Sequence, residues 1–293
     1  MNRQKDFLPV LTASLGHIIW GFRVLFSRVA LQTAHPDVLL SIRFLLAAFL
    51  MTLLILFKKA HVSFRGKDLK PLLLLAASEL LYFYFESYGI LYTNATFAGV
   101  VLAVVPVVAI FLSILFLKEF PTRRQALFCL LPVAGVMVMT VSGSSLGIIR
   151  PLGVFFLICS CLSSAAYKTA NRRSSEEFTS FERTYAVILA CAVVFTISAL
   201  FSVRFDLAAY LAPLSTPSFL FCVMMLSVFC SLGANLLVNH AAARMPVVQL
   251  SSFGSLTTLC SMFAGVLFLG EPMSAGLFLG AVLILIGIRQ VTK

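Results

Sequence analysis

Five ionisable side chains lie inside long apolar stretches of the sequence: His17, Arg23, Arg43, Glu79 and Glu86. An ionisable group near the centre of a bilayer is costly, so it faces a partner or water and usually serves a function. The two arginines and two glutamates carry formal charges that cancel. This balance predicts a compensated network whose first candidate pair is Arg43 with Glu86 or Arg23 with Glu86. For Arg43, a purely structural ion pair remains open.

One helix face would combine acidic and aromatic groups. Glu79, Tyr82, Phe83 and Glu86 recur at i, i+3, i+4 and i+7, which places them on one side of a helix. Such a wall suits the ammonium group of an amphipathic cation or an amino acid through cation–π contact. A glutamate without a partner in a low dielectric could also bind and release a proton, whereas a paired glutamate would stay charged.

A second group of candidates lies on the first apolar run. Trp20 is the sole tryptophan, and Arg23 follows it by about one helical turn. We expect both to face the same substrate space, with His17 one turn before them. Packing, or anchoring at the membrane interface, remains the alternative for the aromatic residues.

Three further apolar runs carry stripes of polar residues. The members are Ser227, Ser231, Asn235 and Asn239; Ser160, Ser163, Ser164 and Tyr167; and Gln249, Ser252, Ser255 and Thr258. In lipid such a stripe must meet protein or water. Substrate contact and plain helix–helix hydrogen bonding are both open. Pro106 is expected to kink its helix and to leave a carbonyl exposed near the site.

These residues need membrane helices to position them. The chain has 293 residues, 60% of them hydrophobic and 11% charged, which excludes an ordinary soluble domain and a disordered chain. Long apolar runs satisfy their backbone in lipid as helices. We predict an all-α integral membrane protein with ten helices near residues 8–31, 37–57, 71–92, 95–117, 123–141, 151–170, 180–202, 216–241, 246–269 and 273–290.

The net charge of +11 is explained by topology, with the lipid bilayer and not nucleic acid as the partner. If the N-terminus is cytoplasmic, every basic residue between helices falls on that side except Arg150 and Arg204, with Lys168 and Arg183 counted among the cytoplasmic ones. Positive charge of this kind marks the cytoplasmic side. Both termini are therefore expected in the cytoplasm.

The sequence repeats itself weakly. Residues 114–119 (ILFLKE) resemble residues 266–271 (VLFLGE), and Gly135 and Gly287 each follow the closing glutamate by the same distance. The repeat is then five helices long, over residues 1–143 and 144–293. An odd number of helices inserts the second copy upside down, and inverted repeats are typical of secondary transporters with a site near the midplane.

Several of these residues together resemble the EamA-type drug/metabolite transporter superfamily. They are Ile19-Trp20-Gly21, Arg28, Pro36, Arg43-Phe44, Pro106, Glu119, Leu269-Gly270-Glu271-Pro272 and Leu285-Ile286-Gly287. The resemblance implies two inverted five-helix repeats, no cofactor, a cavity among helices 1, 3, 4, 6, 8 and 9, and export of small organic metabolites from a prokaryotic cell. Arg23 departs from the small or polar residue common in the family, and Thr258 stands where the first repeat has Pro106.

The predicted function is a secondary transporter, an exporter or exchanger of small amphipathic metabolites such as amino acids, in the plasma membrane. A multidrug or organic-cation proton antiporter and, less favourably, a channel remain alternatives. The sequence has neither a phosphate-binding Gly-x-x-x-x-Gly-Lys loop nor a His-Glu-x-x-His zinc motif, which disfavours an enzyme or an ATP-driven pump. Gly276 and Gly280 form a small-x-x-x-small face that permits a homodimer.

Overall fold

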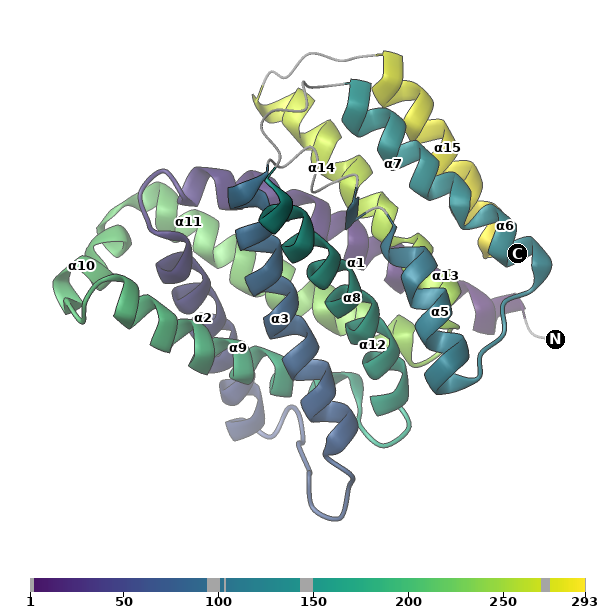
Figure 1. Cartoon of the computed structure of the whole chain (residues 1–293). Coiled ribbons are helices and arrows are strands. Elements are labelled where there is room, and N and C mark those ends of the chain that lie inside the picture. The colour runs from purple at the N-terminus through teal and green to yellow at the C-terminus, as the bar shows by residue number, and fades with distance from the viewer. Residues whose placement is uncertain (1–2, 94–100, 103, 143–149, 270–274, 293) are drawn as a thin grey trace.

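The computed structural model describes residues 3–93, 101–102, 104–142, 150–269 and 275–292, and all regular structure in these ranges is helical (Figure 1). The helices are α1 (Arg3–Ala30), α2 (Pro36–Leu56), α3 (Lys70–Tyr92), α5 (Val105–Leu117), α6 (Arg123–Phe128), α7 (Leu130–Ser142), α8 (Pro151–Ser174), α9 (Ser180–Ser202), α10 (Leu207–Leu211), η1 (Ala212–Ser215), α11 (Pro217–Met224), η2 (Met225–Ala234), α12 (Asn235–Ala242), α13 (Val247–Ser252), α14 (Gly254–Leu269) and α15 (Ala275–Val291).

Six helical stretches among the described residues are long and apolar enough to cross a membrane: Phe7–Ser27, Pro36–Leu56, Pro151–Ser174, Ser180–Ser202, Pro217–Ala242 and Val247–Phe268. Shorter apolar helices cover Val105–Leu117 and Phe278–Val291. The all-helical membrane fold is therefore confirmed, whereas the count of ten spans stays a prediction.

Besides the fourth run, three of the predicted helices are not continuous α-helices. The fifth run divides into α6 and α7 next to Cys129, and the ninth divides into α13 and α14 at Phe253. The eighth run is α-helical at both ends, as α11 and α12, but its middle, η2, is a π-helix. The pattern of apolar residues did not indicate the short elements α10 and η1, which connect α9 to α11.

Pro106 lies at the start of a helix, not in its interior. It occupies the first turn of α5, which begins at Val105 after a turn at Val104. A proline in the first turn has no intrahelical hydrogen bond to lose. Residues 101–102 are helical, Val104 is in a turn and α5 resumes at Val105, so the chain departs from regular α-helix directly before the proline. The expected kink of the helix over 95–117 stays a prediction. Residues 94–100 and 103 lie outside the described residues.

The principal helix contacts join the two halves of the chain. α3 packs on α8, α2 on α9, α7 on α15, and α1 on α14 and on the segments of the eighth run; α3 with α8 and α7 with α15 lie side by side in Figure 1. In a five-helix repeat the third run corresponds to the eighth, the fourth to the ninth and the sixth to the first. The contact of α3 with α8 therefore corresponds to that of the eighth run with α1, and the contact of α5 with α8 corresponds to that of α14 with α1. The packing therefore has the paired pattern that two equivalent halves require.

The two repeat-related glycines permit close packing of α7 and α15. A Cβ on Gly135 would lie 2.7 Å from the carbonyl oxygen of Gly280, and a Cβ on Gly287 would lie 2.3 Å from Cδ of Pro132. Gly280, on the face expected to suit another helix or a second protomer, thus packs against α7 of the same chain. A homodimer stays a prediction and gains no support from this residue.

We expect Gly287→Ala to lower the free energy of unfolding by about 1–3 kcal/mol, because the added methyl group collides with the rigid ring of Pro132. Thermal unfolding of the purified protein in detergent measures the change. Gly233→Ala is the control, since its Cβ would lie 3.4 Å from the nearest atom. Equal melting temperatures for the two variants would contradict close packing at Gly287.

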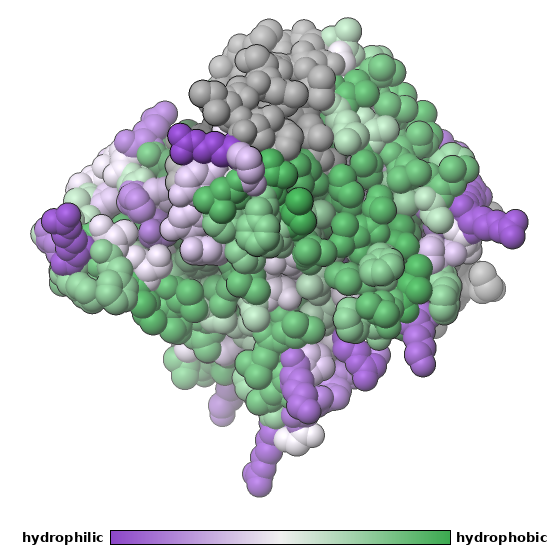
Figure 2. Space-filling view, in the orientation of Figure 1, coloured by the Kyte–Doolittle hydropathy of each residue, from purple (hydrophilic) through white to green (hydrophobic). Residues whose placement is uncertain are grey.

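The surface is largely apolar where the helices face outward. Exposed side chains include Phe49, Phe111, Leu115, Phe155 and Phe278, each more than half exposed. Figure 2 shows apolar residues over most of the visible face, with hydrophilic side chains concentrated at the lower edge and at the left and right ends. An extended apolar surface of this kind is suited to lipid.

Candidate functional site

A charged and aromatic cluster lies where α1 meets α3. The hydroxyl of Tyr82 donates a hydrogen bond to Oε1 of Glu86 over 2.6 Å. The guanidinium of Arg23 lies 5.7 Å from the ring centre of Phe83 and interacts electrostatically with Tyr82 and Glu86. The predicted face of α3 is therefore turned toward Arg23, and of the two candidate partners of Glu86 it is Arg23 that interacts with it.

Arg43 has a different partner from the expected one. Its Nε donates to Oγ of Ser231 over 2.6 Å, while Oγ of Ser227 donates to the Arg43 carbonyl over 2.9 Å. Its guanidinium also lies 5.1 Å from the ring centre of Phe44. An Arg43–Glu86 ion pair within 4.0 Å does not occur among the described residues. The buried Arg43 therefore fixes α2 against the π-helix η2.

Glu79 lies among several positive charges. It interacts electrostatically with Arg23, Arg43 and Lys168. Lys168 was counted among the basic residues of the cytoplasmic side, at the end of the helix predicted over 151–170, but α8 continues to Ser174 and so places it farther from the helix end. With Lys168 added, three cations (Arg23, Arg43 and Lys168) accompany two carboxylates (Glu79 and Glu86), so the group carries one formal positive charge more than the four residues predicted from the sequence. We call these five residues the charged cluster.

His17 and Trp20 lie beside the charged cluster on α1. The His17 ring is buried, bonds through Nδ1 to the Ala13 carbonyl over 2.8 Å, and meets the Trp20 ring edge-on at 5.2 Å. Nε1 of Trp20 donates to the Cys230 carbonyl over 3.1 Å. His17 also interacts electrostatically with Lys168. These contacts hold α1 against η2 and bring His17 toward α8.

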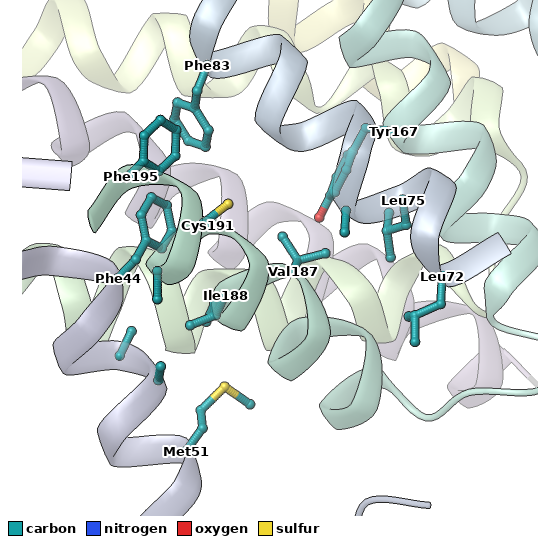
Figure 3. Packing of buried hydrophobic residues seen from close by; sticks show 14 of the residues in the cluster. Phe44, Met51, Leu72, Leu75, Phe83, Tyr167, Val187, Ile188, Cys191 and Phe195 are labelled. Atoms are coloured by element: carbon teal, nitrogen blue, oxygen red, sulfur yellow. The ribbon is translucent and has the colours of Figure 1, made fainter. Parts of the chain in front are cut away.

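Phe83 and Tyr167 belong to an apolar cluster formed by α2, α3, α8 and α9 (Figure 3). The ring of Phe83 packs edge-on against Phe44 at 5.8 Å and against Phe195 at 6.0 Å. Both predicted site residues are buried. Their packing supports the wall behind the charged cluster, and any contact of these two rings with substrate stays a prediction.

Asn239 lies in a separate polar cluster. Its Nδ2 donates to Oγ1 of Thr184 over 2.7 Å, and its Oδ1 accepts from Nδ2 of Asn171 over 2.6 Å. Arg183 donates to the carbonyl of Asn239 over 2.6 Å, to the carbonyl of Asn171 over 2.7 Å and to Oδ1 of Asn171. Asn239, Thr184, Asn171 and Arg183 are each at most 1% exposed. We call them the Arg183 cluster; within it, both ends of the Asn239 amide already have partners.

The polar stripe of the eighth run follows the change of helix type. In an α-helix a step of four residues overshoots one turn, so a stripe with this spacing drifts around the axis. The wider i→i+5 turn of η2 opposes the drift and keeps Ser227 and Ser231 directed at Arg43. Asn235, at the start of α12, donates from Nδ2 to the Ser231 carbonyl over 2.7 Å, while its buried Oδ1 has no hydrogen-bond partner among the described residues.

Gln249 and Ser252 lie on the short helix α13, which packs on α5 and α8. Oγ of Ser252 donates to the Gln249 carbonyl over 2.7 Å, so this serine satisfies its own helix. Two residues after Ser252, Gly254 begins α14, and a Cβ on Gly254 would lie 3.5 Å from Nζ of Lys168. The break between α13 and α14 is thus adjacent to the charged cluster, whereas contacts of Gln249 and Ser252 with it stay predictions.

Sequence reasoning missed Lys168, Asn171 and Arg183. One more turn along the polar stripe of α8 would have reached the first two, since Lys168 follows Ser164 by four residues and Asn171 follows Tyr167 by four. Arg183 follows a capping box formed by Thr179 and Glu182, and so it reads as an ordinary residue of a first turn. Only its neighbours show that it is buried.

The fold and the cluster define a multi-pass membrane protein with ionisable groups held between its two halves. The EamA-like transporter family model matches residues 7–141 and again 151–292. The chain therefore belongs to the EamA-like transporter family.

Similar proteins support this assignment. The chain is 34% identical to the uncharacterized transporter YcxC of Bacillus subtilis, over 98% of this chain and 94% of that protein. It is 24% identical to the uncharacterized transporter YvbV of the same organism, over 92% and 87% of the two chains. A solved crystal structure shares the fold with a TM-score of 0.80 at 18% identity, covering 97% of this chain and 96% of that one.

Proposed function

We propose that the protein is a secondary carrier that exports or exchanges small amphipathic metabolites, such as amino acids, by alternating access. The single observation that carries the proposal is the charged cluster, because α1, α2 and α3 of the first half and α8 of the second half supply its members. Ionisable groups inside a membrane protein mark transport pathways, and a site between two halves can be exposed to either side when the halves rock.

A second contact between the halves supplies a means of closing one side. Glu119, after α5, accepts from Nε of Arg172 on α8 over 2.8 Å and from the backbone nitrogen of Val247 over 3.1 Å. Arg172 also donates to the carbonyl of Ala243 over 2.8 Å. The carboxylate thus faces the start of α13 and the guanidinium faces the end of α12, as the helix dipoles favour. In the proposed cycle this contact breaks and re-forms.

We further propose that the inverted topology places both termini and the Glu119–Arg172 contact on the cytoplasmic side of the plasma membrane. The distribution of basic residues between helices supports this orientation. Cysteine labelling of intact cells at an exposed site of each connection tests it. Labelling at Lys59 but not at Arg204 by a membrane-impermeant reagent would contradict it.

Reconstitution into liposomes tests the carrier proposal. Liposomes loaded with an unlabelled compound are given the same compound in labelled form, across a panel of neutral, acidic and basic amino acids and aromatic amines. We expect saturable counterflow for at least one class. Single-channel currents, or uptake that rises linearly with concentration, would instead support a channel and overturn the proposal.

The organic-cation proton antiporter is a second candidate, because two carboxylates, Glu79 and Glu86, belong to the charged cluster. The same liposomes distinguish it when a pH gradient is imposed. An antiporter would accumulate an aromatic amine against its gradient, whereas the proposed metabolite carrier would equilibrate its substrate by counterflow without the pH gradient.

We expect Glu119→Gln to lower the free energy of unfolding by about 1–2 kcal/mol, since a partly buried charge-assisted contact is lost while Arg172 stays in place. Thermal unfolding in detergent measures the loss. Glu176→Gln is the matched control: its ion pair with Arg173 is 60% exposed, and exposed pairs contribute little. If both variants have the melting temperature of the wild type, Glu119 does not hold the two halves together.

A further inference from the structure

Lys168 lies well inside the membrane-spanning helix α8. It lies six positions before the last residue of this helix, Ser174, which places its Cα about 9 Å along the axis from that end. The amino group interacts electrostatically with Glu79 on α3 and with Cys161, two turns back along α8. Nζ also lies next to Gly254 at the break between α13 and α14.

The Lys168 side chain extends toward the interior of the molecule and not toward the membrane surface. A lysine near a helix end commonly extends its amino group to the membrane surface. Lys168 does the opposite: its Nζ lies against Gly254 at the break between α13 and α14, and the groups with which it interacts electrostatically, Cys161 and Glu79, lie toward the middle of the molecule. This direction agrees with the general tilt of helical side chains toward the helix N-terminus. The ammonium is therefore held among α1, α3, α8 and α14, with His17 on the α1 side.

Within the described part of the chain, the ammonium of Lys168 has no direct partner. No hydrogen bond or ion pair between the described residues involves its Nζ, and the carboxylate of Glu79 is not within 4.0 Å of it. The other two cations differ: Arg43 is bonded to Ser231, and Arg23 lies on Phe83 beside Glu86. Lys168 is half-buried, so the three donors of its ammonium are available to a ligand that enters the cluster. An incoming anionic group would satisfy them.

The net charge of the charged cluster also favours an anionic ligand. Three cations and two carboxylates leave one positive charge uncompensated among its described members. A bound carboxylate would neutralise the cluster, whereas a bound organic cation would raise its charge further. The aromatic wall formed by Tyr82 and Phe83 lies on the same face of α3 as Glu79 and can accept the apolar part of such a ligand.

We propose that Lys168 binds the carboxylate of the transported compound, so that the substrates are metabolites bearing a carboxylate and not organic cations. This inference rests on the proposed function and assigns the substrate class of the same site. Glu79 acts as a positioning residue, since its negative charge draws the Lys168 ammonium toward α3 without neutralising it by direct contact.

Thermal unfolding of the purified full-length protein with three related probes tests the inference. The probes are 3-phenylpropionate, phenylalanine and phenethylamine, which share a ring and carry a negative, a zwitterionic and a positive charge. A ligand that binds the folded state raises the melting temperature. We expect the acid and the amino acid to raise it and the amine to leave it unchanged.

Variants of Lys168 make the test specific. Lys168→Met should weaken acid binding at least about tenfold, the loss expected for one charge-assisted contact, and Lys168→Arg should retain most of it. Without ligand, Lys168→Met should melt no lower than the wild type, because an ammonium without a direct ion-pair or hydrogen-bond partner is removed; a structural lysine would give the opposite result. Lys59→Met, at an exposed position, is the control.

The outcomes separate the two proposals. Three results would overturn the inference about Lys168. The first is stabilisation of the wild type by phenethylamine as strong as that by 3-phenylpropionate and phenylalanine. The second is no stabilisation by either carboxylate-bearing probe, and the third is full binding of these probes by Lys168→Met. Saturable counterflow of any other labelled compound would then leave the carrier function standing. Absence of saturable flux for every compound, with acid binding at Lys168 intact, would overturn the carrier function alone.

Discussion

Replacing Glu86 with glutamine is expected to reduce saturable counterflow at least about tenfold. Glutamine keeps an oxygen that can accept the hydrogen bond from Tyr82, but it removes the negative charge that faces Arg23. A guanidinium that loses its countercharge in a low-dielectric interior is strongly destabilised. It then adopts another position or recruits an anion, and either change removes the arrangement that α1 and α3 present to a substrate.

Two further variants show whether charge or hydrogen bonding matters at Glu86. Tyr82→Phe removes the hydrogen bond and leaves the charge, so its loss of counterflow should be smaller than that of Glu86→Gln. Glu176→Gln removes an exposed carboxylate and should transport like the wild type. Initial rates at several substrate concentrations, with the amount of folded protein in the liposomes measured, provide the comparison. Full transport by Glu86→Gln would exclude this carboxylate from the mechanism.

Replacing Arg183 with alanine is expected to lower the free energy of unfolding by about 3–5 kcal/mol. The fully buried guanidinium donates to the carbonyls of Asn171 and Asn239, which lie in the last turns of α8 and α12. The Asn239 carbonyl also accepts from the backbone nitrogen of Ala243 over 3.3 Å, and the Asn171 carbonyl from Oγ of Ser174 over 3.2 Å. Arg183 is therefore a second donor to each carbonyl and, among the described residues, the one donor to Oδ1 of Asn171. Hydrogen bonds to a charged group contribute about 1.5–3 kcal/mol each, and a buried acceptor left without a donor costs about 1–3 kcal/mol. One side chain on α9 thus closes the ends of two other helices.

Arg173→Ala is the matched control for this prediction. Arg173 belongs to the same stretch of chain as Arg183 but is 59% exposed, and its ion pair is with the equally exposed Glu176. We expect a change within about 0.5 kcal/mol, as for most exposed pairs. Thermal or denaturant unfolding in detergent measures both variants. A melting temperature for Arg183→Ala within the error of the control would show that the Arg183 cluster contributes little to stability.

The helices were largely predictable from the sequence because their signals are local. Apolar runs of membrane length, prolines at the starts of α2, α8 and α11, and glycine or charged residues between runs set the boundaries to within a few residues. Two departures from regular α-helix were not predictable from hydropathy. The π-helix η2 and the break at Phe253 leave the apolar run uninterrupted, so hydropathy alone cannot distinguish them from regular α-helix.

The candidate site was predictable only in part. Spacing along α3 correctly placed Tyr82 and Glu86 together, because residues of one helix face keep their relation whatever packs against them. Partners on different helices were less certain: Arg43 bonds Ser231 and not Glu86, and Asn239 lies in the Arg183 cluster. A pairing between helices depends on their rotation and depth, which the order of residues within one helix does not specify.

Helical structure, a membrane location and charges inside the membrane all follow from the sequence, since composition and the spacing of apolar residues express the preference of each side chain for lipid or water. Which of these charges meet depends on how the helices pack. Lys168 and Arg183 look like ordinary basic residues near helix ends, and they become an unpaired interior ammonium and a buried clamp because α3, α12 and α14 pack around them. Burial of a charge is a property of its neighbours, and most of those neighbours come from distant parts of the chain.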